Sequence, residues 1–302
     1  MFATLAGGYP RPAPPEDPGA PDPALAVILA EQAAAGLEIL SDGLVHDAGS
    51  NAETLAGVLV ARWAAAAAAA ERPVKLAVLG PISAAAAGQG PAGAVAEALN
   101  GALGALAAAG CRLIEVHEPA ATTIRDEAGR AAFTDAHRRL AADLGDCVHL
   151  SLAITGGNAD ALGAAALIAA PYASYLLDLV DGPESWRLVV EVPGDRGIVC
   201  GALDATGRGR TRLEELVFAA RYAASTGGRG LDRVGIAPSG SLAGRPREEA
   251  LAAIGLLGEA AALLRGDHED LLRRLDPRAV DARSAAIGEY RPRRPRSARP
   301  GG

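Results

Sequence analysis

The sequence lacks the usual features of secreted and membrane-spanning proteins. It has three cysteines, an odd number at wide spacing, so we expect no disulfide framework and a reducing, cytoplasmic environment. Its start, MFATLAGGYP, has no charged segment followed by a long apolar core, which predicts no secretory leader. The longest uncharged apolar stretch, Trp63 to Ala70, is far too short to cross a bilayer, and so we expect no membrane partner.

Basic charge is also scarce over most of the chain. The formal net charge is −7 and no basic stripe interrupts the body of the sequence, which predicts no nucleic-acid partner. The last stretch, EYRPRRPRSARPGG, is basic and rich in proline with few apolar groups, as is typical of a solvated, disordered tail. We therefore predict one folded domain over residues 1–280 and a disordered Arg/Pro-rich tail over residues 281–302.

The chain does contain a regular alternation of β-like and helical segments. The β-like runs are Thr4–Ala6, Leu37–Leu40, Val74–Leu79, Leu113–Val116, Val148–Ile154, Tyr175–Val180, Gly197–Leu203 and Val234–Ala237. The helical spacers are Ala24–Ala35, Ala52–Glu71, Ala92–Ala109, Asp135–Asp143, Asn158–Ala169, Leu213–Ser225 and Arg247–Arg265. Such alternation favours an α/β fold with a parallel sheet, and eight units close most simply into a (β/α)8 TIM barrel. A doubly wound open sheet is the alternative.

Ionisable residues follow several of the predicted strands. In CRLIEVHEP an apolar run ends on His117 and Glu118, and Asp42, Asp178 and Asp204 lie at other strand ends. In a parallel barrel these positions surround the substrate pocket, where polar groups are not locked in the core. A lone acid there is also an ordinary turn or helix-capping residue, but their coincidence at one rim predicts an active site.

The fifth predicted strand carries a possible metal-binding pattern. In CVHLSLAIT, Cys147, His149 and Ser151 lie at alternate positions and hence on one face. A thiolate and an imidazole two residues apart can both ligate a metal. A buried cysteine is also a common small apolar residue, and a single histidine at a strand end commonly serves as a hydrogen-bonded polar group.

Seven segments resemble, in the same order, the hallmark segments of cobalamin-independent methionine synthase, specifically its catalytic barrel and the stand-alone core form. They are TLAGGYPRP, EQAAAGLEILSDG, VKLAVLGPIS, GCRLIEVHEP, VHLSL, GALDA and APSGSL. The wider superfamily includes uroporphyrinogen decarboxylase. The resemblance implies a (β/α)8 barrel and a role in methionine biosynthesis. Zinc would bind a small thiol such as homocysteine, whose thiolate attacks a methyl group carried by a folate or another donor.

The resemblance also implies a zinc site, but with departures from the family pattern. His149 and Asp178 match two ligand positions, while Ser151 and Gly240 stand where the family has cysteines. Thiolates supply much of the affinity of such a site, so the resemblance implies lost or altered zinc binding. A rearranged site built from Cys147, His149 and Cys200 is an alternative.

The resemblance assigns roles to residues at the predicted rim. His149 is the expected general base, oriented by Asp178. The expected catalytic residues are His149, Asp178, Glu118 and His117. The expected substrate-binding residues are Gly7, Gly8, Asp42, Glu118 and Asp204.

Two other functions stay open. One is a different lyase or decarboxylase reaction on the same barrel, and the other is a non-catalytic homologue that binds a metabolite or a protein.

Overall fold

The computed structural model describes residues 1–11, 22–48, 51–144 and 148–266, which contain eight strands, nine α-helices and five short 3-10 helices. The strands are β1 (Phe2–Ala3), β2 (Leu40–Ser41), β3 (Val74–Leu79), β4 (Leu113–His117), β5 (His149–Ile154), β6 (Ser174–Asp178), β7 (Gly197–Leu203) and β8 (Val234–Pro238). The α-helices are α1 (Pro23–Ala34), α2 (Ala52–Ala69), α3 (Pro81–Ala86), α4 (Ala92–Ala108), α5 (Glu127–Ala141), α6 (Ala164–Leu167), α7 (Trp186–Glu191), α8 (Leu213–Ser225) and α9 (Arg247–Arg265). The 3-10 helices are η1 (Pro119–Thr123), η2 (Asp160–Leu162), η3 (Pro183–Ser185), η4 (Thr226–Gly228) and η5 (Leu231–Arg233).

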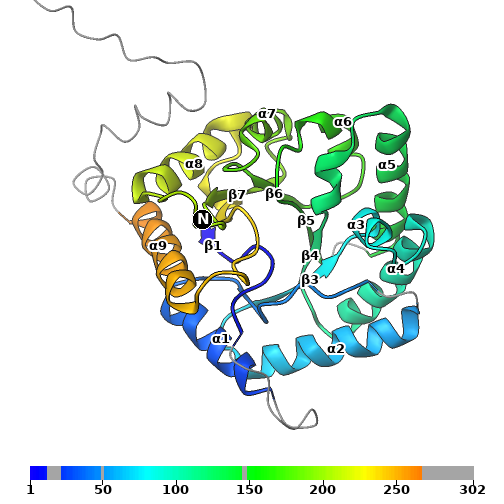
Figure 1. Cartoon of the computed structure of the whole chain (residues 1–302), viewed down its shortest axis with the longest axis horizontal. Helices are drawn as coiled ribbons and strands as arrows, with labels where there is room; N and C mark the ends of the chain where they lie inside the picture. Colours follow the sequence, from blue (N-terminus) through cyan, green and yellow to red (C-terminus); the bar gives the residue numbers. More distant parts are fainter. Residues whose placement is uncertain (12–21, 49–50, 145–147, 267–302) are drawn as a thin grey trace, which may run out of the picture.

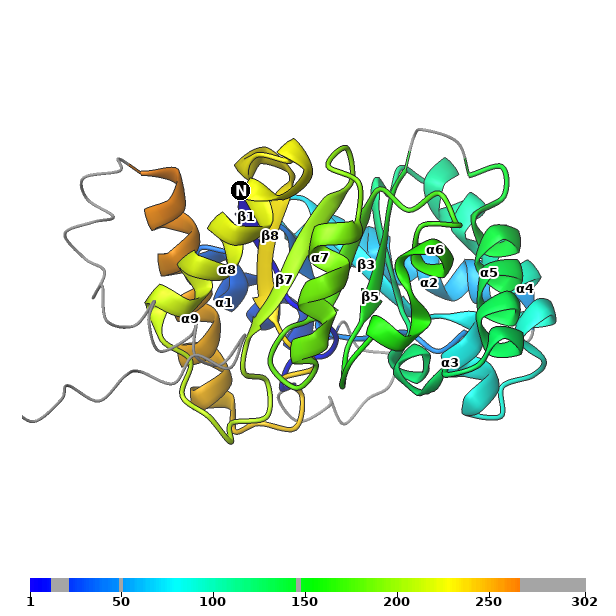
Figure 2. The ribbon, with the colours of Figure 1, turned by 90° about the horizontal axis from the view of Figure 1, so that it is seen from above.

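The strands form one parallel sheet that curls on itself. Its order is β1-β8-β7-β6-β5-β4-β3-β2. A parallel bridge between Thr4 and Ile39 joins the two ends of this order, and the Glu38 N–H donates to Ala3 O across the same junction. The helices surround the curled sheet as an outer ring (Figure 1), and the view from above shows the strands running side by side between the helices (Figure 2). The predicted α/β class with a parallel sheet is confirmed, and its shape is barrel-like.

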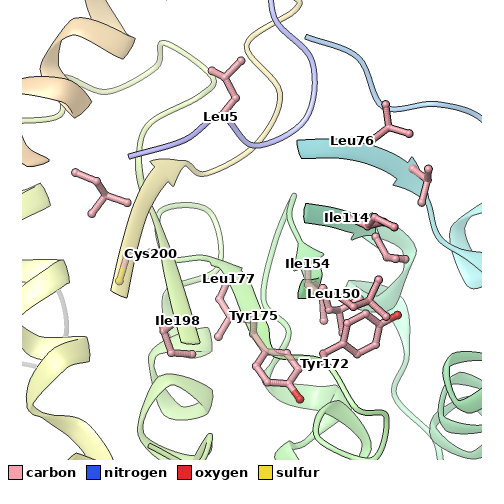
Figure 3. Close-up of a cluster of buried hydrophobic side chains, with 14 of the residues drawn as sticks. Leu5, Leu76, Ile114, Leu150, Ile154, Tyr172, Tyr175, Leu177, Ile198 and Cys200 are labelled. Carbon is pink, nitrogen blue, oxygen red and sulfur yellow. The ribbon is translucent and has the colours of Figure 1, made fainter. Parts of the chain in front are cut away.

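Side chains alternate along each strand between the helices and the barrel interior. On β4, Ile114 and Val116 belong to the large apolar cluster shared with the helices, part of which is drawn in Figure 3. A second, smaller cluster fills the interior with Ala6, Ala153, Leu176, Val199 and Ala237. These residues are mostly small, because side chains from all around the ring converge on the barrel axis. The alternation therefore sends the intervening residues of β4, Glu115 and His117, inward.

Two sequence expectations concern the edges of this fold. Residues 267–302 lie outside the described part of the chain, so the boundary at residue 280 and the disordered tail stay predictions. Within the described part, α2 is the one helix long and apolar enough to cross a membrane. Length and composition are the only features of α2 that would suit a membrane, and α2 packs beside α4 and β3 in the outer layer.

Candidate active site at the carboxyl end of the barrel

The loops that follow β1, β2 and β8 enclose a cavity at the carboxyl ends of the strands. The Tyr9 N–H donates to Gly43 O at 2.9 Å, and the Leu242 N–H donates to Gly8 O at 2.8 Å. Gly7 has a φ of +70°, and a Cβ at this position would lie only 3.3 Å from Ser241 Cα, a combination that favours glycine. The cavity has a volume of about 620 Å³, and its lining includes Gly7, Gly8, Arg11, His117, Thr155 and Ser241. Two of the predicted substrate-binding residues, Gly7 and Gly8, thus form part of its wall.

His117 is the histidine that lines this cavity, and its side chain contacts a buried ion pair between Lys75 and Glu115. Its Nε2 lies 2.7 Å from Glu115 Oε1, while the other carboxylate oxygen of Glu115 accepts a 2.7 Å bond from Lys75 Nζ. Lys75 Nζ also donates to Leu5 O at 2.7 Å. The exposed fractions of Lys75, Glu115 and His117 are only 5%, 2% and 4%. The three side chains therefore form a compact polar group inside the barrel, directly below the cavity.

Charge keeps the Glu115 carboxylate ionised. Burial alone would raise the pKa of Glu115, but the Lys75 ammonium and the hydrogen bond from His117 outweigh this effect and lower the pKa to about 2. An ionised carboxylate can only accept a hydrogen bond, so His117 carries its proton on Nε2, and Nδ1 is the nitrogen that can accept. Nδ1 has no hydrogen-bond partner within the described residues. A histidine in this arrangement can take a proton from a group in the cavity.

Glu118, the neighbour of His117, faces away from the cavity. Its carboxylate accepts bonds from the Ile82 N–H at 2.9 Å and from the Ser83 N–H and Oγ at 2.8 and 2.6 Å. His137 Nε2 of α5 lies 3.1 Å from the same carboxylate, without hydrogen-bond geometry. Glu118 is fully buried and binds the free N–H groups of the first turn of α3. Glu118 directly follows β4, and its carboxylate binds α3, so its expected contact with substrate stays a prediction that these bonds do not favour.

The three predicted aspartates lie at the carboxyl end, but each carboxylate is engaged by its own loop. Asp178 accepts N–H groups of Gly156, Gly157, Val180 and Asp181 at 2.9 to 3.1 Å. Asp42 binds the Leu44 N–H and His46 Nε2, and Asp204 binds Thr206 and the Gly209 N–H. Burial raises the pKa of Asp178. The pKa of Asp204 is lowered, because its hydrogen bonds outweigh the effect of burial. All three hold the loops around the cavity in place.

His149 lies at the opposite end of the barrel from Asp178. It is the first residue of β5, whereas Asp178 ends β6 next to Leu177, whose partner on β5 is Ile154. At a rise of ~3.3 Å per residue the two side chains are about 20 Å apart. His149 Nε2 instead lies 2.8 Å from Ser174 Oγ, and His149 borders a separate amino-end cavity of about 270 Å³. His149 and Asp178 cannot share a metal or act as a base and its orienting acid.

The remaining expected zinc positions do not fit zinc either. Ser151 accepts a 3.0 Å bond from Ser174 Oγ inside the barrel, and Gly240 has no side chain to offer. Cys200 is fully buried with its thiol 3.5 Å from Ala219 O of α8, and burial raises the pKa of Cys200 to about 12. Cys147 lies outside the described residues. The described part of the chain contains no group of three His, Cys, Asp or Glu side chains placed to hold a metal ion.

Sequence reasoning missed two residues of this site, Lys75 and Glu115. A signal was present, because VKLAVL and LIEVH each place one charged residue inside an otherwise apolar strand. Glu115 and His117 also stand two residues apart, and so they share a face.

Comparison with known proteins gives partial matches in sequence. Over 144 residues the chain is 36% identical to 5-methyltetrahydropteroyltriglutamate–homocysteine methyltransferase of Rhodopseudomonas palustris, in each of two strains. This match covers 46% of the chain and only 17% of the length of these relatives. No protein-family model matches the chain. The expected resemblance to cobalamin-independent methionine synthase is confirmed by this match.

Solved structures share the fold over nearly the whole chain. A B12-independent methionine synthase from Shewanella sp. W3-18-1, in complex with selenomethionine, superposes with a TM-score of 0.69 at 17% identity, covering 90% of this chain and 98% of that one. A methyltransferase from Methanosarcina mazei superposes with a TM-score of 0.57 at 13% identity, covering 87% and 95%. At these identities the likeness establishes the fold alone.

Proposed function

Starting from this resemblance, we propose that the protein is a methionine synthase-like methyltransferase built on a complete (β/α)8 barrel. Its acceptor is a small thiol such as homocysteine, bound in the cavity at the carboxyl ends of the strands. The observation that carries the proposal is the position of His117, which lines that cavity while its Nε2 is fixed on Glu115. This geometry is suited to removing a proton from a bound thiol.

The proposed reaction is a methyl transfer from nitrogen to sulfur. His117 Nδ1 takes the thiol proton, and the thiolate sulfur then forms a bond to the methyl carbon of the donor. The carbon–nitrogen bond of the donor breaks, its electron pair stays on that nitrogen, and a proton from solvent neutralises it. The donor is a reduced folate that carries an N-methyl group, as the name of the curated relatives suggests. The cationic imidazole beside Glu115 is stabilised by the carboxylate while the thiolate reacts.

The other residues of the mouth have supporting roles in this proposal. Gly7 and Gly8 border the bound substrate and let their loop pack closely against Ser241, and Asp42, Asp178 and Asp204 fix the loops. Zinc, which the resemblance implies, would activate the thiol if bound, but the donor set at its expected positions does not fit, and no step is assigned to it. We place the enzyme in the cytoplasm with small molecules as its partners, consistent with the free thiols of Cys111 and Cys200.

A binding barrel without turnover is the second candidate. It is favoured by one observation, namely that Asp42, Asp178 and Asp204 are all engaged by loop groups. None of these carboxylates is left to hold the amino group of an amino acid. A lyase or decarboxylase reaction has no comparable observation in its favour.

The two candidates are separated by a turnover assay combined with calorimetry. The full chain is incubated with homocysteine and 5-methyltetrahydropteroyltriglutamate, and methionine is quantified, while the binding heat of each compound is measured separately. The enzyme proposal predicts methionine above the uncatalysed background. Binding of either compound without methionine would instead support the binding barrel. The absence of both methionine and binding heat would contradict both candidates.

A further inference from the structure

We propose that Lys75 is a positioning residue that supplies the positive charge balancing Glu115, so that His117 stays neutral and able to accept a proton. The use of His117 as a base rests on the proposed function. The charge balance itself is a property of the folded chain and can be tested without turnover.

The geometry places one cation and one anion in contact inside the barrel. Lys75 projects inward from β3, and Glu115 projects inward from the neighbouring strand β4. Lys75 Nζ lies 2.7 Å from Glu115 Oε2 and 2.7 Å from Leu5 O, so two of its three N–H groups have close acceptors. Both side chains are almost fully buried. The pair therefore carries no net charge into the barrel interior.

Burial makes this balance matter for the neighbouring histidine. An uncompensated ion in a protein interior costs several kcal/mol, so a buried group of ionisable residues tends toward neutrality. With Lys75 present, its positive charge already balances the negative charge of Glu115, and no positive charge on His117 is required. Without Lys75, His117 is the other close group that can compensate Glu115, and it would do so by binding a second proton. An imidazolium has no lone pair on Nδ1 and cannot act as a base.

Other charged groups around the cluster do not replace Lys75. Arg11 lines the cavity, but its guanidinium donates to Asp42 O at 2.9 Å and pairs with Asp22. His149 lies at the amino end of the barrel, where burial lowers its pKa against the opposing effect of the Glu115 charge, and its Nε2 contacts Ser174 Oγ. Glu118 lies on the far side of β4 with α3 and His137. Within the described residues, Lys75 is the cation that contacts Glu115.

The test is the protonation state of the His117 ring, measured by ¹⁵N NMR at pH 7.5 on the full chain with labelled histidine. Five histidines are present, and His117→Asn assigns the signal. In the wild-type protein we expect a neutral ring with its proton on Nε2. In Lys75→Met we expect protons on both ring nitrogens and a loss in kcat of about 100-fold at little change in KM.

Two further variants protect the test against simple misfolding. Lys75→Met/Glu115→Gln removes both charges and should restore a neutral His117. Glu118→Gln removes a buried carboxylate on the opposite face of β4 and should leave the His117 signal unchanged. A ring that stays neutral in folded Lys75→Met would overturn the proposal, as would a double variant that is still protonated. If the NMR result is as expected but the wild-type protein forms no methionine, the charge balance stands and the proposed function fails.

Discussion

The two ends of the barrel each present a histidine beside a cavity, and the two sites differ in what stands behind the ring. At the carboxyl end, His117 contacts an ionised carboxylate that is itself fixed by Lys75, below a cavity of about 620 Å³. At the amino end, His149 Nε2 contacts the hydroxyl of Ser174, next to a cavity of about 270 Å³. A carboxylate both orients an imidazole and stabilises its protonated form, whereas a hydroxyl does neither strongly. The difference favours the carboxyl end as the place of the proposed proton transfer.

The largest expected effect comes from the same substitution at each end. His117→Asn should lower the rate of methyl transfer by at least about 100-fold, because the base is lost. His149→Asn should leave the rate within about twofold, since His149 lies about 20 Å from the carboxyl-end residues. Single-turnover methionine formation checks both variants. Equal losses would erase the distinction between the two ends.

The second-largest expected effect is the destabilisation by acid of the buried group formed by Lys75, Glu115 and His117. The folded-state pKa of Glu115 is lowered from 4.5 to about 2. The ionised carboxylate therefore contributes fully to the free energy of unfolding above pH 4.5, and this contribution is lost as the pH falls toward 2. The contribution is on the order of 3 kcal/mol. Urea unfolding of the wild-type protein and Glu115→Gln between pH 6 and pH 3 measures it. The gap in unfolding free energy should narrow with acid, and a constant gap would contradict the assigned ion pair.

A smaller effect is expected behind β4. Glu118→Gln should lower the free energy of unfolding by about 1–3 kcal/mol, because the N–H groups of Ile82 and Ser83 lose a charged acceptor. Hydrogen exchange should show the loss concentrated in α3. A fully stable variant that binds homocysteine more weakly would instead return Glu118 to the substrate site.

The smallest effect is expected at the amino end. Ser174→Ala removes the partner of His149 Nε2 and should cost about 1 kcal/mol of unfolding free energy, the typical value of one hydrogen bond. Methyl transfer should not change. A loss of turnover in this stably folded variant would show that the amino end takes part in the reaction.

Much of the fold could be predicted from the order of segments in the sequence. The expected ranges Val74–Leu79 and Gly197–Leu203 coincide with β3 and β7, because both are apolar runs with clear boundaries. The short helices α3 and α7 were missed, since six residues give too little helical periodicity to detect. Helix α5 begins eight residues before the expected start at Asp135, at Glu127, where Asp126 caps it through the Gly129 N–H.

The candidate site was harder to predict, because a sequence pattern does not say which end of a strand a residue occupies. His149 was expected at the rim, yet it begins β5, and Thr155 follows the carboxyl end of that strand. His117 and Glu118 were expected to act together, yet His117 lines the cavity while the Glu118 carboxylate binds the first turn of α3. Lys75 and Glu115 escaped notice because they are distant in sequence, and only the register of β3 and β4 brings them together.

The central claim is that His117, held by Glu115 and Lys75, removes the proton of the thiol. In an enzyme with bound zinc, the metal would activate the thiol instead. Its most direct test measures methionine formation and zinc content in the same chelator-treated sample of the full chain. The account predicts turnover that is unchanged when zinc falls far below one atom per chain. Turnover that rises in proportion to added zinc would contradict it.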